Sequence, residues 1–172
     1  MKLRRLSKIT IALGIYIVAS AAFMLKIRNW LFKVFGNFIV VTCFRLFFIL
    51  IFVLTITHAF RISLNLFKIC AVFVIFILGY LFSMWQPYFS EKTHVLTYGL
   101  LGYLAANDFV DTKRKLQFKN VVLAICFVAS ISALDEIFQS ILPYRVGDAR
   151  DFITNVISGA FGMGLLLTLK NE

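Results

Sequence analysis

The sequence predicts an all-α fold, a polytopic transmembrane helix bundle with about six spans (five to six). Of its 172 residues, 61% are hydrophobic and only 15% are charged, and 20 are Phe. Apolar runs at 46–60, 69–85 and 121–142 approach or exceed the roughly 20 residues that cross a bilayer core. A soluble fold of this size does not bury that much apolar surface.

The first apolar run, Ile9 to Leu25, follows a basic stretch at residues 2–8. This order is typical of a signal anchor that is retained in the membrane. Because Ala19-Ser20-Ala21 resembles a cleavage site, a removed signal peptide is the alternative.

The second apolar stretch, Val34 to Phe60, is too long for one untilted span and contains Arg45. A charge at the centre of the membrane costs about 2.5–3.5 kcal/mol on insertion scales. We therefore expect an interfacial segment over Trp30 to Phe44, with Arg45 near the headgroups and the span beginning near Leu46.

The remaining spans are expected at 69–85, 93–109, 121–142 and 152–169. They divide the chain into an N-terminal transmembrane hairpin, residues 1–65, and a four-helix membrane domain, residues 66–172.

The net charge of +10 raises the question of nucleic acid, but the Lys and Arg residues lie between apolar runs and form no aromatic-interleaved surface. They are better explained as topology signals and as contacts with membrane lipids. Cys43, Cys70 and Cys126 lie in apolar runs without CxxC spacing, so neither a disulfide framework nor a zinc site is indicated. No motif predicts a cofactor.

Three segments concentrate the unusual polar residues: 90–94, 135–139 and 143–155. In the six-span arrangement they share the outer membrane face, and Asp135 lies within the hydrocarbon layer. Four-residue spacings put the members of each pair on one helix face. The pairs are His94 with Tyr98, Asp135 with Gln139 and Asp151 with Asn155. Small residues on the same helices should let the backbones approach closely. They are Gly99, Gly102, Ser158, Gly159 and Gly162.

This polar cluster has two chemical interpretations. Lys92, Arg145 and two helix N-termini suit an anionic group, whereas His94 beside Asp135 and Glu136 suits acid/base chemistry. Structural alternatives remain open: helix capping by Glu91 and Asp151, pairing of Asp135 with Arg145, and interhelical hydrogen bonds of Gln139 and Asn155. No spacing is diagnostic of a metal site.

The same segments resemble the VanZ-like family, small membrane proteins named for one linked to low-level teicoplanin resistance. The resemblance covers residues 69–169 and rests on motifs at 91–94, 98–102, 135–139, 143–145 and 148–151, followed by Asn155 and Gly159. It implies a protein of the bacterial plasma (inner) membrane. Glu91 stands where many members have Asp.

We therefore expect a cell-envelope protein whose outer pocket binds an anionic lipid-linked or cell-wall-related group. The alternative is an integral membrane enzyme acting on a lipid headgroup, and a small transporter is the least favoured function. Membrane lipids are the expected partners. The expected catalytic residues are His94, Asp135 and Glu136, and the expected ligand-binding residues are Lys92, Gln139, Arg145, Asp151 and Asn155.

The distribution of basic residues predicts that both termini are cytoplasmic, because more Lys and Arg then lie inside than outside. Cysteine labelling of intact cells should modify a Cys at Val146 from the outside, and Cys at 113–115 only after the membrane is opened. Labelling of position 146 only from the cytoplasm would reverse this orientation.

Overall fold

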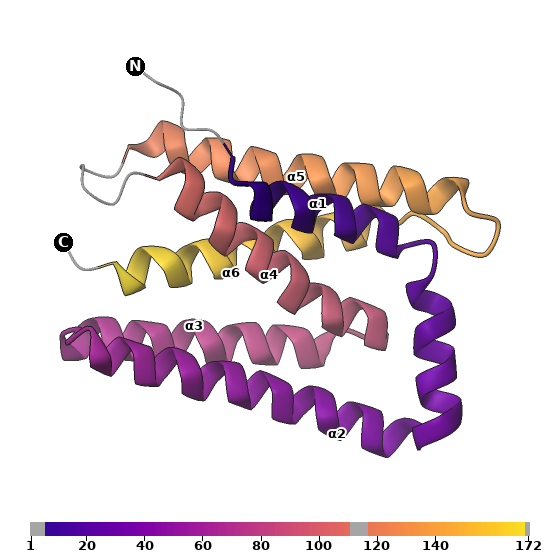
Figure 1. The fold of residues 1–172 in the computed structure, drawn as a ribbon, viewed down its shortest axis with the longest axis horizontal. Coiled ribbons are helices and arrows are strands. Elements are labelled where there is room, and N and C mark those ends of the chain that lie inside the picture. Colours follow the sequence, from indigo (N-terminus) through magenta and orange to yellow (C-terminus); the bar gives the residue numbers. More distant parts are fainter. Residues whose placement is uncertain (1–5, 111–116, 171–172) are drawn as a thin grey trace.

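The computed structural model describes residues 6–110 and 117–170, which form six helices and no strand. Most of the helices run along the long axis of the molecule, and the chain passes back and forth between its two ends (Figure 1). The helices are α1 (Lys8–Ser20), α2 (Met24–Arg61), α3 (Leu66–Trp85), α4 (Phe89–Phe109), α5 (Phe118–Ile141) and α6 (Ala149–Leu169). The predicted all-α class is confirmed.

Four of the described helices, α2, α3, α5 and α6, are long and apolar enough to cross a membrane. Helix α1 is shorter, with 13 residues, so it extends only about 20 Å. Helix α4 is long enough but carries the polar residues of the cluster. The expected six spans thus correspond to six helices, of which four meet the criteria of length and composition.

Helices α4 and α6 form the centre of the bundle, and small residues bring their backbones together. A Cβ atom at Gly102 would overlap the backbone of Gly159, and one at Gly162 would overlap the carbonyl group of Gly99. The predicted small-residue faces of α4 and α6 are therefore confirmed, and they pack against each other.

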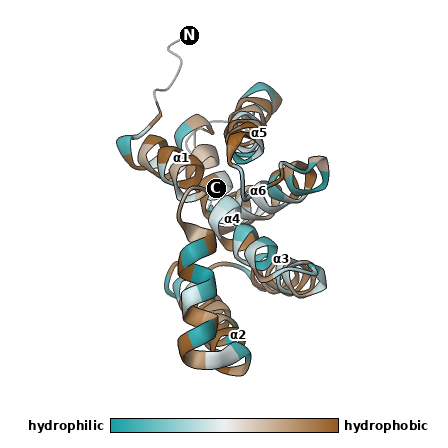
Figure 2. Cartoon of the chain, turned by 90° about the vertical axis from the view of Figure 1, so that its right-hand side faces the viewer, coloured by the Kyte–Doolittle hydropathy of each residue, from teal (hydrophilic) through white to brown (hydrophobic). Residues whose placement is uncertain are grey.

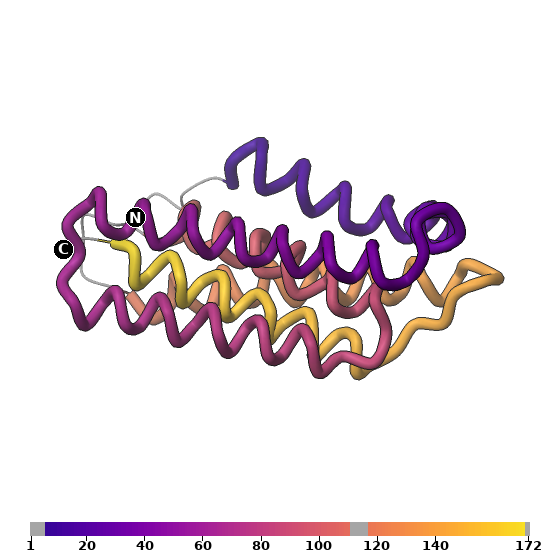
Figure 3. Tube along the Cα trace, turned by 90° about the horizontal axis from the view of Figure 1, so that it is seen from below, coloured from indigo at the N-terminus to yellow at the C-terminus, as the bar shows by residue number. Residues whose placement is uncertain are grey.

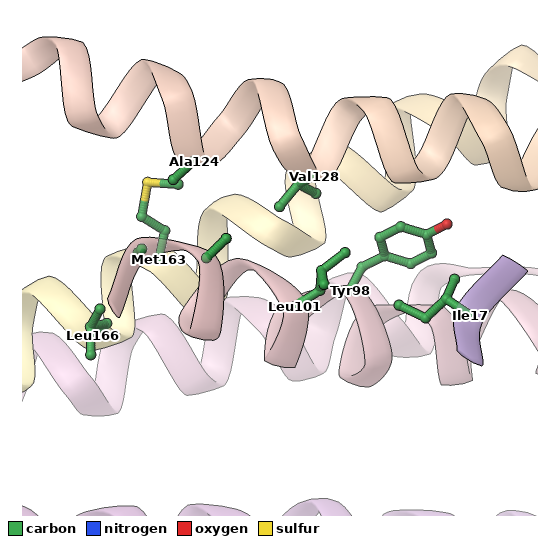
Figure 4. Packing of buried hydrophobic residues seen from close by; sticks show 9 residues of the cluster. Ile17, Tyr98, Leu101, Ala124, Val128, Met163 and Leu166 are labelled. Atoms are coloured by element: carbon green, nitrogen blue, oxygen red, sulfur yellow. The ribbon is translucent and has the colours of Figure 1, made fainter. Parts of the chain in front are cut away.

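An apolar core surrounds this crossing. Ile17 of α1, Leu101 of α4, Val128 of α5 and Met163 of α6 are buried in one cluster. The ring of Tyr98 belongs to the same cluster, and its hydroxyl group is directed away from Met163 and Leu166 (Figure 4). Tyr98 thus places its hydroxyl oxygen on the side of the core that faces one end of the bundle.

Helix α2 changes direction at Gly36, which has φ +75° and ψ 161°. Only Gly adopts such a backbone without strain. The segment before Gly36 lies across one end of the bundle and the segment after it runs along the bundle (Figures 1 and 3). The bend thus lies at Gly36 rather than near Phe44, where the interfacial segment was expected to end. Arg45 is exposed within the long segment.

Helix α1 is fixed to the bundle by a partly buried polar contact. Asp108, near the C-terminus of α4, accepts hydrogen bonds from the Ser7 amide at 2.8 Å and from the Thr10 hydroxyl at 2.6 Å. A carboxylate is favourable at a helix N-terminus. Together with the burial of Ile17 and Ala21, this contact packs α1 against the bundle.

The glycine crossing yields a test with a matched control. Gly102→Ala should lower the free energy of unfolding by about 1–3 kcal/mol or more, because the added methyl group would overlap backbone atoms of Gly159. Gly79→Ala in α3 meets no atom within 4 Å and should be neutral or slightly stabilising. Equal thermal stability of the two purified variants in mild detergent would contradict the crossing.

Candidate functional site

The polar residues meet at one end of the bundle, which we call the site end. Helices α1, α3 and α5 finish there and α4 and α6 begin there (Figure 1). The first segment of α2, residues 24–35, crosses this end and carries hydrophilic turns among hydrophobic ones (Figure 2). The predicted convergence of segments 90–94, 135–139 and 143–155 therefore matches the fold.

Asp135 of α5 is the most deeply buried carboxylate of this end, with an exposed fraction of 2%. Its Oδ2 atom accepts a hydrogen bond of 2.9 Å from the Tyr98 hydroxyl of α4. Its Oδ1 atom is buried without a hydrogen-bond partner. Because a buried oxygen without a hydrogen bond is costly, a further hydrogen-bond donor beside Asp135 Oδ1 would be stabilising.

A second chain of contacts orients His94. Its Nδ1 atom lies 3.1 Å from Asn155 Oδ1, and Asn155 Nδ2 donates a 3.0 Å hydrogen bond to Ser132 Oγ. Asn155 is fully buried. Since an amide oxygen only accepts, Nδ1 of His94 carries the hydrogen and Nε2 remains for other partners.

Ionic contacts at the rim hold the beginnings of α4 and α6 together. Arg150 donates to Glu91 Oε1 at 2.6 Å, although Glu91 is only 5% exposed. Glu136 Oε2 accepts the backbone amide of Asp148 at 2.9 Å, and the Asp148 side chain caps α6. The carboxylates of Glu91, Glu136 and Asp148 thus fix the helix ends in this structure.

The α5–α6 loop is tied to the opposite wall of the site. The Tyr144 hydroxyl donates to the carbonyl oxygen of Ala22, between α1 and α2, at 2.7 Å. The next residue, Arg145, has a buried Nε atom without a hydrogen-bond partner. The loop therefore brings an unsatisfied guanidinium group into the region between α1, α2 and α5.

A cavity of about 230 Å³ occupies that region. It has contributions from α1, the crossing segment of α2, α4, α5 and the α5–α6 loop. Arg28, Arg145 and Asp135 are its charged lining residues, so its wall is positive overall. The uncharged polar lining comes from Ser20, Ser90, Thr93, His94, Thr97 and Gln139.

The expected site residues divide into two groups. His94, Asp135, Gln139 and Arg145 line the cavity, and Asn155 supports it through His94. Glu136, Asp151 and Lys92 do not line it. Asp151 lies 3.6 Å from Arg150, and Lys92 Nζ donates to the carbonyl oxygen of Met84 at the end of α3.

One expected alternative is wrong: among the described residues, no ion pair joins Asp135 to Arg145. Asp135 instead pairs with Tyr98, because α4 and α5 pack closely, whereas Arg145 lies in the following loop. No group of three or more described His, Cys, Asp and Glu side chains is arranged to hold a metal ion.

Sequence reasoning missed Arg28 and Ser132 as members of this region. Ser132 gave no signal beyond lying one turn before Asp135. Arg28 did give one, because three basic residues, Lys26, Arg28 and Lys33, lie in a segment that was expected to face outward, against the charge bias on which that orientation rests. A basic residue that does not fit the charge bias is a candidate for a role in binding, and Arg28 lines the cavity.

The apolar helices and the polar cavity at one end define an integral membrane protein of the polytopic helical class. Residues 6–170 match the VanZ/LLP1 family, and the chain belongs to that family. The match includes α1 and α2 as well as the segments that carry the resemblance. No curated protein and no solved structure matches the chain.

The contact between Tyr98 and Asp135 gives a stability test. Tyr98→Phe should lower the free energy of unfolding by about 1–3 kcal/mol, because it leaves the buried carboxylate without its hydrogen-bond donor. Tyr103→Phe is the control, since the Tyr103 hydroxyl makes no hydrogen bond within the described residues. Thermal unfolding in mild detergent measures the stability of both variants. Equal losses of stability would show that the hydrogen bond to Asp135 is not the cause.

Proposed function

We propose that the cavity at the site end binds the anionic headgroup of a membrane lipid or of a lipid-linked cell-wall precursor, without altering it chemically. The observation that carries this proposal is the pair of guanidinium groups, Arg28 and Arg145, in the wall of one small cavity. Arg presents planar, charged donors that match phosphate and carboxylate groups.

The state of these cations supports an anionic ligand. The buried Arg145 Nε has no partner. Arg28 donates to Asn29 Oδ1 at 3.0 Å, and its remaining N–H groups are available for a ligand. A buried guanidinium N–H without a partner is costly, and an anion held in the cavity would offset that cost.

The surroundings of the cavity favour a ligand with a hydrocarbon chain over a small soluble anion. Tyr16, Ile17, Leu25 and Leu31 contribute apolar walls. A second cavity of about 520 Å³, almost entirely apolar, lies between α2, α3, α4 and α6. Thr97 lines both cavities, so the polar and apolar spaces border the same turn of α4.

Binding is preferred to catalysis because of how His94 is held. An acid/base pair requires a carboxylate within hydrogen-bond reach of the imidazole. His94 pairs with Asn155, and no hydrogen bond joins it to Asp135 or Glu136 in the described part of the chain. The enzyme alternative now rests on Nε2 of His94 alone.

Lipid analysis tests this proposal directly. The protein purified in mild detergent should retain anionic lipids with unchanged headgroups, identified by mass spectrometry. Arg145→Gln should reduce the retained amount about tenfold or more, because it removes a charge-assisted hydrogen bond. Lys33→Gln, an exposed cation of the crossing segment, is the matched control and should retain the wild-type amount.

Two outcomes would contradict the proposal. Equal lipid retention by the wild type and by Arg145→Gln would remove the cavity as the binding site. A headgroup that is altered in the presence of the wild type but not of a His94→Ala variant would establish the enzyme instead.

The family resemblance extends the proposal to susceptibility to teicoplanin, an antibiotic of the cell envelope. On this proposal, expression in a sensitive bacterium should raise the inhibitory concentration, and Arg145→Gln should abolish the increase. A change that Arg145→Gln leaves intact would separate any resistance from the cavity.

A further inference from the structure

The cavity contains a group that a simple anion does not satisfy. Asp135 lines it with an exposed fraction of only 2%, and its Oδ1 atom has no hydrogen-bond partner. An anionic ligand alone would leave this oxygen unpaired and would repel the ionised carboxylate. The wall therefore combines two cationic groups with one acceptor that still requires a donor.

We infer that the ligand is a phosphate headgroup that also carries a hydroxyl or ammonium donor, with Arg28 and Arg145 binding the phosphate and Asp135 Oδ1 accepting the donor. This inference rests on the proposed function and adds the chemical class of the headgroup. Phosphate is chosen as the anion because phospholipid headgroups share it at the membrane surface, where helix ends lie.

The arrangement around Asp135 keeps the acceptor oriented. Tyr98 holds Oδ2 from α4 at 2.9 Å, which fixes the carboxylate plane and leaves Oδ1 as the free acceptor. Gln139, on the same face of α5 and 4% exposed, also lines the cavity. Arg145 enters from the loop and Arg28 from the crossing segment of α2. Binding a phosphate from two separate elements leaves its substituent free to reach α5.

The position of this oxygen sets it apart from the neighbouring carboxylates. Glu91 and Glu136 each bind a partner at the helix ends and also keep one buried oxygen without a partner, but neither residue lines the cavity. Asp135 lies deeper, and a Leu or Asn of similar shape would fill the same space at lower cost. A ligand that donates a hydrogen bond to Asp135 Oδ1 would explain why a carboxylate lies beside the cavity.

The test compares two phosphodiester headgroups of equal charge. Short-chain phosphatidylglycerol carries hydroxyl donors, whereas phosphatidylmethanol has a methyl group in their place; phosphatidylethanolamine supplies the ammonium donor. Binding to the full-length purified protein in detergent is measured by calorimetry. At least one donor-bearing lipid should bind about fivefold more tightly than phosphatidylmethanol, the gain expected for one hydrogen bond.

A double variant separates the donor contact from the fold. Tyr98→Phe with Asp135→Leu removes both partners of the buried hydrogen bond and replaces them with apolar groups of similar shape, which is the least disruptive change. This variant should bind phosphatidylglycerol and phosphatidylmethanol, which have equal charge, with equal affinity, while it keeps Arg28 and Arg145. Arg145→Gln should instead weaken all three lipids alike.

The outcomes distinguish a failure of the proposed function from a failure of the headgroup assignment alone. If no phosphate lipid binds in a manner that depends on Arg145, the proposed function fails. If phosphate lipids bind but phosphatidylmethanol binds as tightly as the other two, or the double variant keeps the preference, this inference alone fails. Competition by water-soluble glycerol phosphate would assign the ligand to a soluble phosphate ester, and its absence would assign it to a lipid.

Discussion

The close contact of α4 with α6 is the constraint on which the rest of the structure depends. Gly102 and Gly162 pack directly against backbone atoms of the facing helix, and no larger residue fits there without a shift. In a bilayer, apolar side chains gain little from packing on each other rather than on lipid, so close backbone approach is an important source of helix association. The crossing also sets the height at which His94 faces Asn155.

That height explains why the polar groups are grouped at one end. Once α4 and α6 are fixed, α5 packs on both and brings Ser132 to Asn155 and Asp135 to Tyr98. Tyr98, Asp135, Ser132 and Asn155 each thereby gain a partner from another helix, which lowers the cost of removing them from water. The unsatisfied atoms belong to charged side chains: those of Asp135 and Arg145 border the cavity, and those of Glu91, Glu136 and Asp151 lie at the neighbouring helix ends. One unsatisfied acceptor and one unsatisfied donor thus lie beside the same cavity, as expected of a binding site.

The sequence supported the helical class and the meeting of three polar segments because hydropathy and four-residue spacing are local signals. Gly99, Gly102, Ser158, Gly159 and Gly162 were also correctly matched, since small residues at helical spacing indicate a contact. The partner of Asp135 was wrong, because pairing depends on helix rotation, which a sequence does not give. The turn at Gly36 was missed because an isolated Gly in an apolar stretch is a weak signal until its φ is known.

The central claim is that a lipid headgroup occupies the cavity between α1, α2, α5 and the α5–α6 loop. An electron cryo-microscopy map of the protein in lipid nanodiscs tests it most directly. The account predicts headgroup density in contact with Arg28, Arg145 and Asp135, with a hydrocarbon chain leading from it. A cavity that holds only water, or that closes as α1 and residues 24–35 pack against α5, would contradict it.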